Sequence, residues 1–280
     1  MPTTKQYTRQ EIQDLHKDPY PLWVKDSQLI HVPNKVPTNA RPAFTKVPSD
    51  LINGISYLEI GVDEGETFDL VNSRIKHGVD PYGGSPNITH RMSSQMFFAL
   101  NSYFYGQTYD IVFIDGCHMS KIILQEVEEA LKILNPGGVI ILHDTVPLKE
   151  SAQLVIREEY EHFLSHLPQE NGEYLSFREF SEDNPWLGYN GDSWRAVYKL
   201  RNKPKTENIR VFTFADACCT VVVQEPEMES VEPPPPPEDC LDWEYFYENC
   251  ASILLPVRFD PVVKIFCERL KDYKDSENAS

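Results

Sequence analysis

The stretch "SYLEIGVDEGET", residues 56–67, decides the fold of this chain. An apolar run ends at Gly61, a second glycine follows at Gly65, and a helix-like pattern comes next. Glycine lets a ligand approach the backbone closely, and free N–H groups at the start of a helix attract polar ligand groups. The pattern therefore predicts a buried strand that leads through a ligand-binding turn into a helix over residues 65–75.

Strand and helix patterns alternate after this turn. Further strands are expected to end near residue 80 and to cover 87–92, 109–115, 136–144, 208–216 and 218–224, with helices over 93–105, 120–134, 150–167 and 191–201. This order predicts an α/β fold with a doubly wound, Rossmann-like, mostly parallel seven-stranded sheet. Ligands of such folds bind at the carboxyl ends of the strands.

The distribution of proline and of acidic residues divides the chain into three regions. Residues 1–50 are expected to form a proline-punctuated N-terminal arm, and residues 51–224 the core, with 145–190 as a lid insertion. Residues 225–280 are expected to form an acidic, proline-rich linker and a helical tail. Nine acidic residues and no Lys or Arg lie between Glu225 and Cys250.

Composition excludes several classes of partner. The formal net charge of −17 disfavours nucleic acid, because an acidic surface repels phosphate. No apolar run reaches the roughly 20 residues of a membrane span. The polar N-terminus lacks a signal sequence, so we expect a cytoplasmic protein without a membrane partner. The six cysteines lack the spacing of a zinc site. A homo-oligomer is left open.

Acidic residues around the glycine turn indicate which cofactor it binds. Asp80 ends the second strand, where a carboxylate can receive two ribose hydroxyls, so an adenosine ligand is expected. The G-x-G-x-x-G pattern of dinucleotide sites is absent. Four carboxylates in or beside the turn would repel a pyrophosphate but suit the cationic S-adenosylmethionine: Glu59, Asp63, Glu64 and Glu66.

An ordered set of motifs resembles a known family. These motifs are "YLEIGVDEGETF", "GVDP", "FIDGCH", "LNPGGVIILHDTVP" and "GDSWRAVYKLR". Together they resemble the class I S-adenosylmethionine-dependent methyltransferases, in particular the small-molecule and sugar O-methyltransferase branch with D-G-x-H and H-D motifs. The resemblance covers about residues 55–224. It implies that Glu59, Gly61 and Gly65 hold the methionine part, that Asp80 holds the ribose, and that Ser94 lies near the adenine.

Two strand ends carry the residues expected to act on the acceptor. Asp115 and His118 follow the strand over 109–115 and should border the methyl donor, since this strand and the first are neighbours in such a sheet. His118 is the expected general base for a hydroxyl group. Asp144 ends the adjacent strand, so Asp115 and Asp144 are expected to hold a divalent cation such as Mg²⁺ or to accept from the hydroxyl. The expected acceptor is a hydroxyl of a sugar, a glycan precursor or a small polyol.

Alternatives stay open for these residues and for the activity. His118 or Asp144 could instead cap the following helix or turn. Strand alternation places His143 on the opposite face from Asp144, so we expect it to have a structural role or to support the neighbouring site residues rather than to act in catalysis. Rival functions are a metal-independent methyltransferase with another acceptor, a nicotinamide-dependent oxidoreductase, and a non-catalytic module that retains the fold.

Overall fold

The computed structural model describes 56–147 apart from 72 and 74, then 150–156, 189–202, 209–214, 219–224 and 241–257, and also 174–175 and 235. The expected N-terminal arm lies outside these residues, as do most of the insertion at 145–190 and much of the region 225–280. Among the helices of this described part, none is long and apolar enough to cross a membrane.

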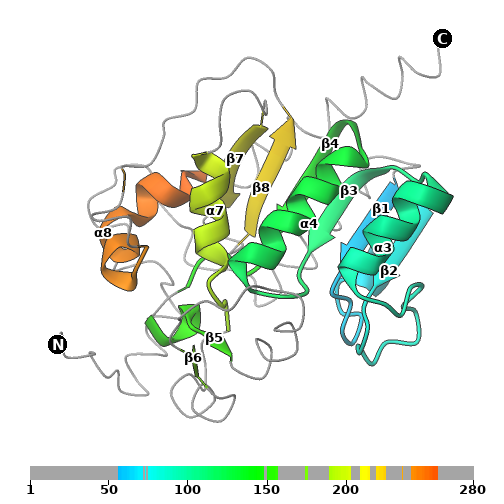
Figure 1. The fold of residues 1–280 in the computed structure, drawn as a ribbon, viewed down its shortest axis with the longest axis horizontal. Helices are drawn as coiled ribbons and strands as arrows, with labels where there is room; N and C mark the ends of the chain where they lie inside the picture. The colour runs from blue at the N-terminus through cyan, green and yellow to red at the C-terminus, as the bar shows by residue number, and fades with distance from the viewer. Residues whose placement is uncertain are drawn as a thin grey trace.

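One sheet organises the molecule, with the strand order β2-β1-β3-β4-β8-β7-β9 (Figure 1). Its six longer strands are β1 (Ser56–Ile60), β2 (Ile75–Val79), β3 (Tyr109–Ile114), β4 (Leu134–Leu142), β7 (Ile209–Phe214) and β8 (Cys219–Gln224). Strands β2, β1, β3 and β4 pair in parallel, and β8 is antiparallel to both β4 and β7. The two-residue β9 (Pro256–Val257) joins the edge. The predicted mixed, mostly parallel α/β fold is therefore confirmed.

Helices α3, α4 and α7 lie across one face of the sheet (Figure 1). The helical elements are α3 (Ser94–Leu100), its π-helical continuation η2 (Asn101–Tyr105), α4 (Ser120–Lys132), α7 (Ser193–Arg201), α8 (Trp243–Leu254), and the short 3-10 helices η1 (Phe68–Leu70) and η3 (Glu150–Gln153). Ile123, Val127 and Ala130 recur every three or four residues along α4 and are buried against the sheet. The α8 ring of Phe246 packs 4.6 Å from Trp194 of α7, so α8 extends the same core.

The opposite face of the sheet has its own apolar core. Tyr57, Phe113 and Ile141 of three neighbouring strands are buried there together with Phe68 of η1 and Val71. Because side chains alternate along a strand, β1 and β3 contribute to both cores, and this explains why they are buried over their whole length.

The strand expected over 87–92 is not formed, so this prediction was wrong. His90 makes a single isolated bridge to Val79 of β2. The Thr89 hydroxyl lies 2.9 Å from the Gly78 N and 3.0 Å from the Gly78 O, and this side chain occupies positions where a continuing ladder would pair. The sheet therefore has seven strands, but the seventh is the two-residue β9 at the edge and not the strand expected over 87–92.

Two expected helices also differ. In place of a helix over 65–75, the described residues form only η1, since Val71 already has an extended backbone with φ −75° and ψ 118°. The segment expected to start a helix at residue 150 forms η3 and then β5 (Val155–Ile156), which pairs with β6 (Tyr174–Leu175). Consecutive β-branched residues favour a strand at this point. The rest of that expected helix lies outside the described residues.

Candidate active site at the strand ends

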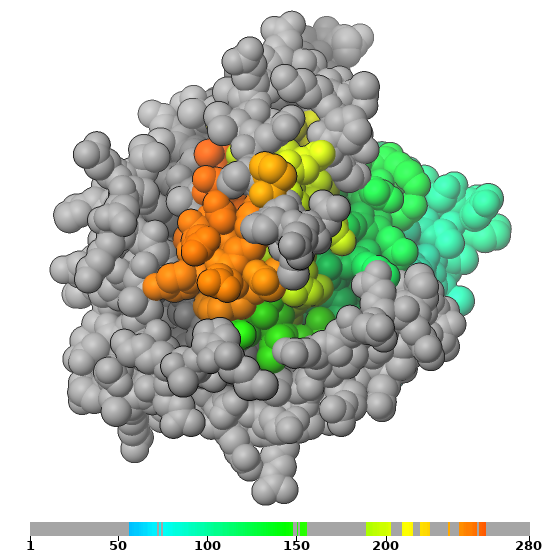
Figure 2. Space-filling model, turned by 60° about the vertical axis from the view of Figure 1, so that its left-hand side comes forward, coloured from blue at the N-terminus to red at the C-terminus, as the bar shows by residue number. Residues whose placement is uncertain are grey.

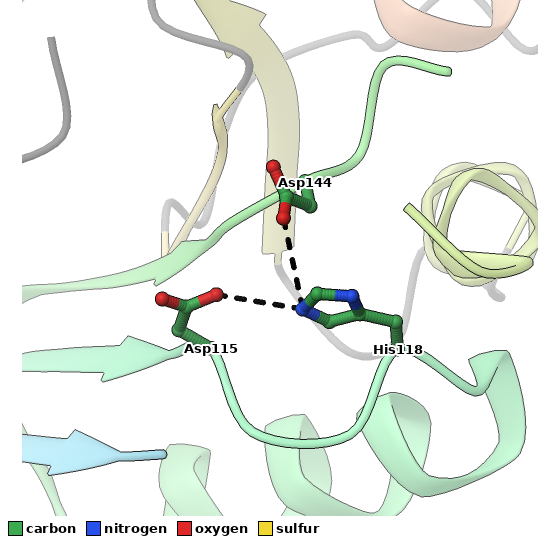
Figure 3. Close-up of side chains that lie close together, drawn as sticks. All are labelled: Asp115, His118 and Asp144. Carbon is green, nitrogen blue, oxygen red and sulfur yellow. Dashed lines mark ion pairs between the residues drawn. The ribbon is translucent and has the colours of Figure 1, made fainter. Parts of the chain in front are cut away.

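Three titratable side chains meet where β3 and β4 end. The His118 Nε2 lies 3.5 Å from the Asp115 Oδ1 and 3.8 Å from the Asp144 Oδ2 (Figure 3). The parallel pairing of β3 with β4 brings the loops after the two strands to the same edge of the sheet. Sequence reasoning placed the two carboxylates on adjacent strand ends, and the structure brings them together with His118.

A fourth side chain, His143, joins this cluster. Its Nδ1 lies 3.1 Å from the Asp115 Oδ1 and 3.2 Å from the Asp144 Oδ1. The expectation that His143 points to the opposite face from Asp144 was wrong. Strand β4 ends at Leu142, and Asp144 has the left-handed φ of 52°, so the alternation of a strand does not extend to these two residues.

The cluster has the donor groups of a cation site. One ligand atom each from Asp115, His118 and Asp144 lies within 4.8 Å of the others. Among the described residues, both ring nitrogens of His118 and the Nδ1 of His143 are buried and make no hydrogen bond. Carboxylate ligands alone suit Mg²⁺, whereas a ligand set that also includes an imidazole suits Mn²⁺ or Zn²⁺ as well. These residues therefore fit a divalent cation.

The glycine turn lies against the same strand end. Gly61 and Gly65 both have φ +84°, a conformation that favours glycine. A Cβ on Gly61 would collide with the main-chain O of Asp115 and the Cα of Gly116. The turn after β1 and the loop after β3 thus touch, as expected for β1 and β3 as neighbours.

Asp80 holds the glycine turn to the loop after β2. Its Oδ2 accepts from the Asp63 N at 2.9 Å, and its Oδ1 accepts from the Tyr82 N at 2.8 Å and the Gly83 N at 2.7 Å. A carboxylate oxygen has two lone pairs, so these bonds leave acceptor capacity for a ligand. The carboxylate is fixed at the position that the sequence assigned to a ribose contact.

Glu59 and Ser94 each have a partner within the protein. Glu59 is 1% exposed and its Oε2 accepts from the Tyr57 hydroxyl at 2.5 Å. The Ser94 hydroxyl, at the start of α3, bonds the carboxyl of Glu126 on α4. The structure therefore places Ser94 against α4, and its expected closeness to the adenine stays a prediction.

Glu126 is a buried acid that sequence reasoning passed over. Burial raises the pKa of Glu126 to about 7, while the Ser94 hydrogen bond and the charge of His118 act in the opposite direction. Its Oε2 is buried with no hydrogen-bond partner in the described part of the chain. The spacing of the apolar residues on α4, which places position 126 beside them on the buried face, was the signal available in the sequence.

The alternative in which His118 caps α4 does not match the structure. The first turn of α4 is capped from a distance by Asp192, which accepts from the Ser120 N at 2.5 Å and from the Ser120 hydroxyl at 2.9 Å. Asp192 is also the N-cap residue of α7, but its side chain does not cap that helix. A cap contributed by a distant segment leaves no local sequence signal.

Residues 62–145 match a protein-family model described as "Methyltransferase domain". The match begins inside the glycine turn and ends one residue after Asp144, so it contains both strand ends of the candidate site. Among the curated proteins, no match is found.

Several solved structures are similar to this chain at low identity. The MycE methyltransferase of mycinamycin biosynthesis, crystallised with Mg, S-adenosylhomocysteine (SAH) and mycinamycin VI, is 14% identical, with a TM-score of 0.35 over 61% of this chain and 45% of its own. The TomG O-methyltransferase of Streptomyces achromogenes with S-adenosylmethionine is 10% identical, with a TM-score of 0.41 over 80% and 92%. A Bacillus cereus O-methyltransferase with SAH is 14% identical, with a TM-score of 0.37 over 79% and 92%. This chain thus spans less than half of the length of MycE.

Proposed function

We propose that the protein is a class I S-adenosylmethionine-dependent methyltransferase that transfers a methyl group to a hydroxyl, because residues 62–145 match a family model described as "Methyltransferase domain". The acceptor is a sugar, a glycan precursor or a small polyol. The observation that supports this activity most directly is the convergence of Asp115, His118 and Asp144 beside the glycine turn. A methyl donor held at Gly61 would have a base and two carboxylates next to its reactive end.

Charge supports S-adenosylmethionine as the donor. Asp63, Glu64 and Glu66 are exposed in or beside the glycine turn, and Glu59 is buried at its start. Together they favour a ligand that carries a sulfonium and an ammonium group and disfavour one that carries a pyrophosphate. Asp80 would accept a ribose hydroxyl through the remaining lone pair of its Oδ2, and Gly61 and Gly65 would let the methionine part approach the backbone.

In the proposed reaction His118 takes the proton of the acceptor hydroxyl as the oxygen attacks the sulfonium methyl group. Holding donor and acceptor side by side supplies much of the remaining acceleration. Asp115 and Asp144 would hold a divalent cation, which would lower the pKa of a bound hydroxyl. The same carboxylates could orient the hydroxyl directly in a metal-independent enzyme.

The geometry raises a second role for His118. Its Nε2 lies near both carboxylates, and a nitrogen that binds a cation has no lone pair for a proton. The His118→Gln variant separates the two roles through the affinity for Mn²⁺, measured by calorimetry. If His118 is a base, the variant keeps its affinity for Mn²⁺ while its turnover falls by about 10²–10⁴-fold. If His118 is a cation ligand, both the affinity for Mn²⁺ and the turnover fall.

Thermal shift with SAH and with NAD⁺ tests the cofactor. We expect SAH to raise the melting temperature and NAD⁺ to leave it unchanged; stabilisation by NAD⁺ alone would instead support the oxidoreductase. Transfer of labelled methyl from S-adenosylmethionine to a panel of sugars and polyols, with and without a chelator, then tests the activity and the metal. Binding of SAH without transfer to any acceptor of the panel would favour a non-catalytic module.

A further inference from the structure

Residues 189–193, here named the bridging segment, contact both loops of the candidate site. The segment leads into α7 and includes its first residue, Ser193. It contacts the loop after β3, which carries His118, and the loop after β4, which carries Asp144. The His118 Nε2 and the Asp144 Oδ2, which come from these two loops, lie 3.8 Å apart (Figure 3). The pairing of β3 with β4 brings the two loops to one edge of the sheet, and contacts beyond the sheet can refine their relative position.

On one side, the bridging segment binds the main chain of Asp144. The Asn190 Nδ2 donates to the Asp144 O at 3.1 Å, and the Ser193 hydroxyl lies 2.5 Å from the same oxygen. Asp144 has φ +52°, a left-handed conformation that is unfavourable for a residue with a Cβ. The Ser193 Oγ also lies 2.8 Å from the Asn190 O, so its one proton is shared between two carbonyls. The contacts from Asn190 and Ser193 to the Asp144 carbonyl therefore stabilise the backbone conformation that directs the Asp144 side chain toward His118.

On the other side, the bridging segment packs on the His118 loop. Gly191 has φ +52°, and a Cβ at this position would collide with the main-chain O of His118. The Asp192 carboxylate caps α4 at Ser120, two residues after His118. The ring of Tyr189 lies with its centroid 5.3 Å from that of His118. The His118 ring is thus bounded by the bridging segment as well as by the carboxylates.

We propose that the bridging segment sets the position of His118 relative to Asp144, and that Asn190 and Asp192 are positioning residues of the methyl-transfer site. This inference rests on the proposed function, because it assigns these residues to the same reaction. Asn190 acts through the Asp144 backbone, and Asp192 acts through the start of α4. Neither is required to touch the donor, the acceptor or a cation.

The positions of the contacts argue against a purely structural role. The Asn190 and Ser193 side chains both reach the one carbonyl of Asp144, and Asp192 reaches the helix turn that follows His118. Other bonds already anchor α7, from Trp194 to the Gln153 side chain and from Arg201 to the Ile253 carbonyl, so the contacts with Asp144 and Ser120 are additional to that anchoring. Small displacements of reacting groups have large effects on rate, so contacts made at the two loops of the site matter for it.

The test uses Asn190→Ala and Asp192→Ala in the full chain, with Asn202→Ala as a matched control. Asn202 ends the same helix, is exposed, and its Nδ2 donates to a main-chain oxygen, that of Tyr198, at 2.9 Å. Three quantities are measured: the Kd for Mn²⁺, the Kd for SAH, and the ¹H–¹³C NMR signal of the His118 ring in ¹³C-histidine-labelled protein. The His118 signal is assigned by its loss in His118→Gln, and the His77 signal serves as an internal reference.

We expect Asn190→Ala to raise the Mn²⁺ Kd by roughly tenfold or more. We expect Asp192→Ala to shift the His118 signal while the His77 signal stays in place. In Asp192→Asn the His118 signal should lie closer to its position in the unmodified protein, because Asn also accepts a hydrogen bond at a helix start. The SAH Kd should stay within about twofold in both, since the proposed donor site lies on the glycine turn. Asn202→Ala should change none of these quantities.

Unchanged Mn²⁺ affinity and an unchanged His118 signal in both variants would overturn the proposal, and so would equal effects in Asn202→Ala. Circular dichroism shows whether each variant folds. If Asn190→Ala does not fold, Ser193→Ala removes the other bond to the Asp144 carbonyl and takes its place. If the unmodified protein binds neither SAH nor Mn²⁺, the proposed function fails, and the His118 signal alone then decides the role of the bridging segment.

Discussion

The Nδ1 of His143 lies 3.1 Å from the Asp115 Oδ1, and the register of the sheet explains why the two residues meet. Ile114 of β3 pairs with Leu142 of β4, so the residue that follows each strand lies beside the other. The centroid of the His143 ring also lies 5.8 Å from that of the Phe113 ring. His143 is therefore placed to orient Asp115 and Asp144, or to bind a cation with them.

Replacing His143 should weaken cation binding at the site without weakening the binding of the methyl donor. We expect His143→Ala to raise the Kd for Mn²⁺ by roughly tenfold or more and to lower methyl transfer, because both carboxylates lose a neighbouring imidazole. The SAH Kd should be unchanged. Calorimetry measures both affinities, with His77→Gln, at a histidine that contacts Tyr109 on β3, as the control. An unchanged Mn²⁺ affinity would show that His143 only packs on Phe113.

The sequence predicted the parts of the site that follow from strand order. Parallel strands end at one edge, so Asp115 and Asp144 could be placed near each other, and a glycine turn after β1 could be placed beside β3. His143 could not be placed correctly, because strand alternation was extended past the last residue of β4. Asn190 and Asp192 could not be found, since their partners lie 46 and 72 positions away in the sequence.

The elements that were predicted wrongly share a physical cause. Over 87–92 the alternation of polar and apolar residues resembles a strand, but the Thr89 side chain bonds the β2 backbone and only one bridge forms. Over 65–75 the residues resemble a helix, yet Val71 is extended and buried against the sheet. In both cases a tertiary contact outweighs the local propensity.

Asp80 should affect both the glycine turn and the cofactor. In Asp80→Asn, an amide group replaces one of the oxygens that accept from Asp63, Tyr82 and Gly83, and the negative charge is lost. We expect a lower melting temperature and a SAH Kd raised by about tenfold or more, since hydrogen bonds to charged groups contribute about 1.5–3 kcal/mol each. Asp69→Asn is the control, because this exposed carboxylate accepts a hydrogen bond from the side chain of Asn87. Equal SAH affinities in the two variants would contradict the ribose assignment.

Glu126 should make the stability of the protein fall as the pH rises. Its folded pKa of about 7 lies above the ordinary 4.5, so the folded state binds this proton more tightly than the unfolded state. The stabilisation is fully present below about pH 4.5 and is lost as the pH rises through about 7, by an amount on the order of 3 kcal/mol. Glu126→Gln should remove this component of the pH dependence, whereas Glu129→Gln, on the exposed side of α4, should retain it. Denaturant unfolding between pH 4 and pH 8 measures the difference, and parallel profiles for the unmodified protein and Glu126→Gln would contradict the prediction.

Gly61 and Gly106 separate the effect of backbone conformation from the effect of space. Both have positive φ, 84° and 59°, but a Cβ on Gly106 meets nothing within 4 Å, whereas one on Gly61 collides with Asp115 and Gly116. Gly106→Ala should therefore lower the free energy of unfolding by about 1–2 kcal/mol, the cost of a left-handed residue, and leave SAH binding intact. Gly61→Ala should lower it by more and abolish SAH binding, because the glycine turn has to move away from the end of β3. Denaturant unfolding and SAH calorimetry on both variants measure the contrast, and a Gly61→Ala variant that binds SAH normally would show that the donor does not lie on this turn.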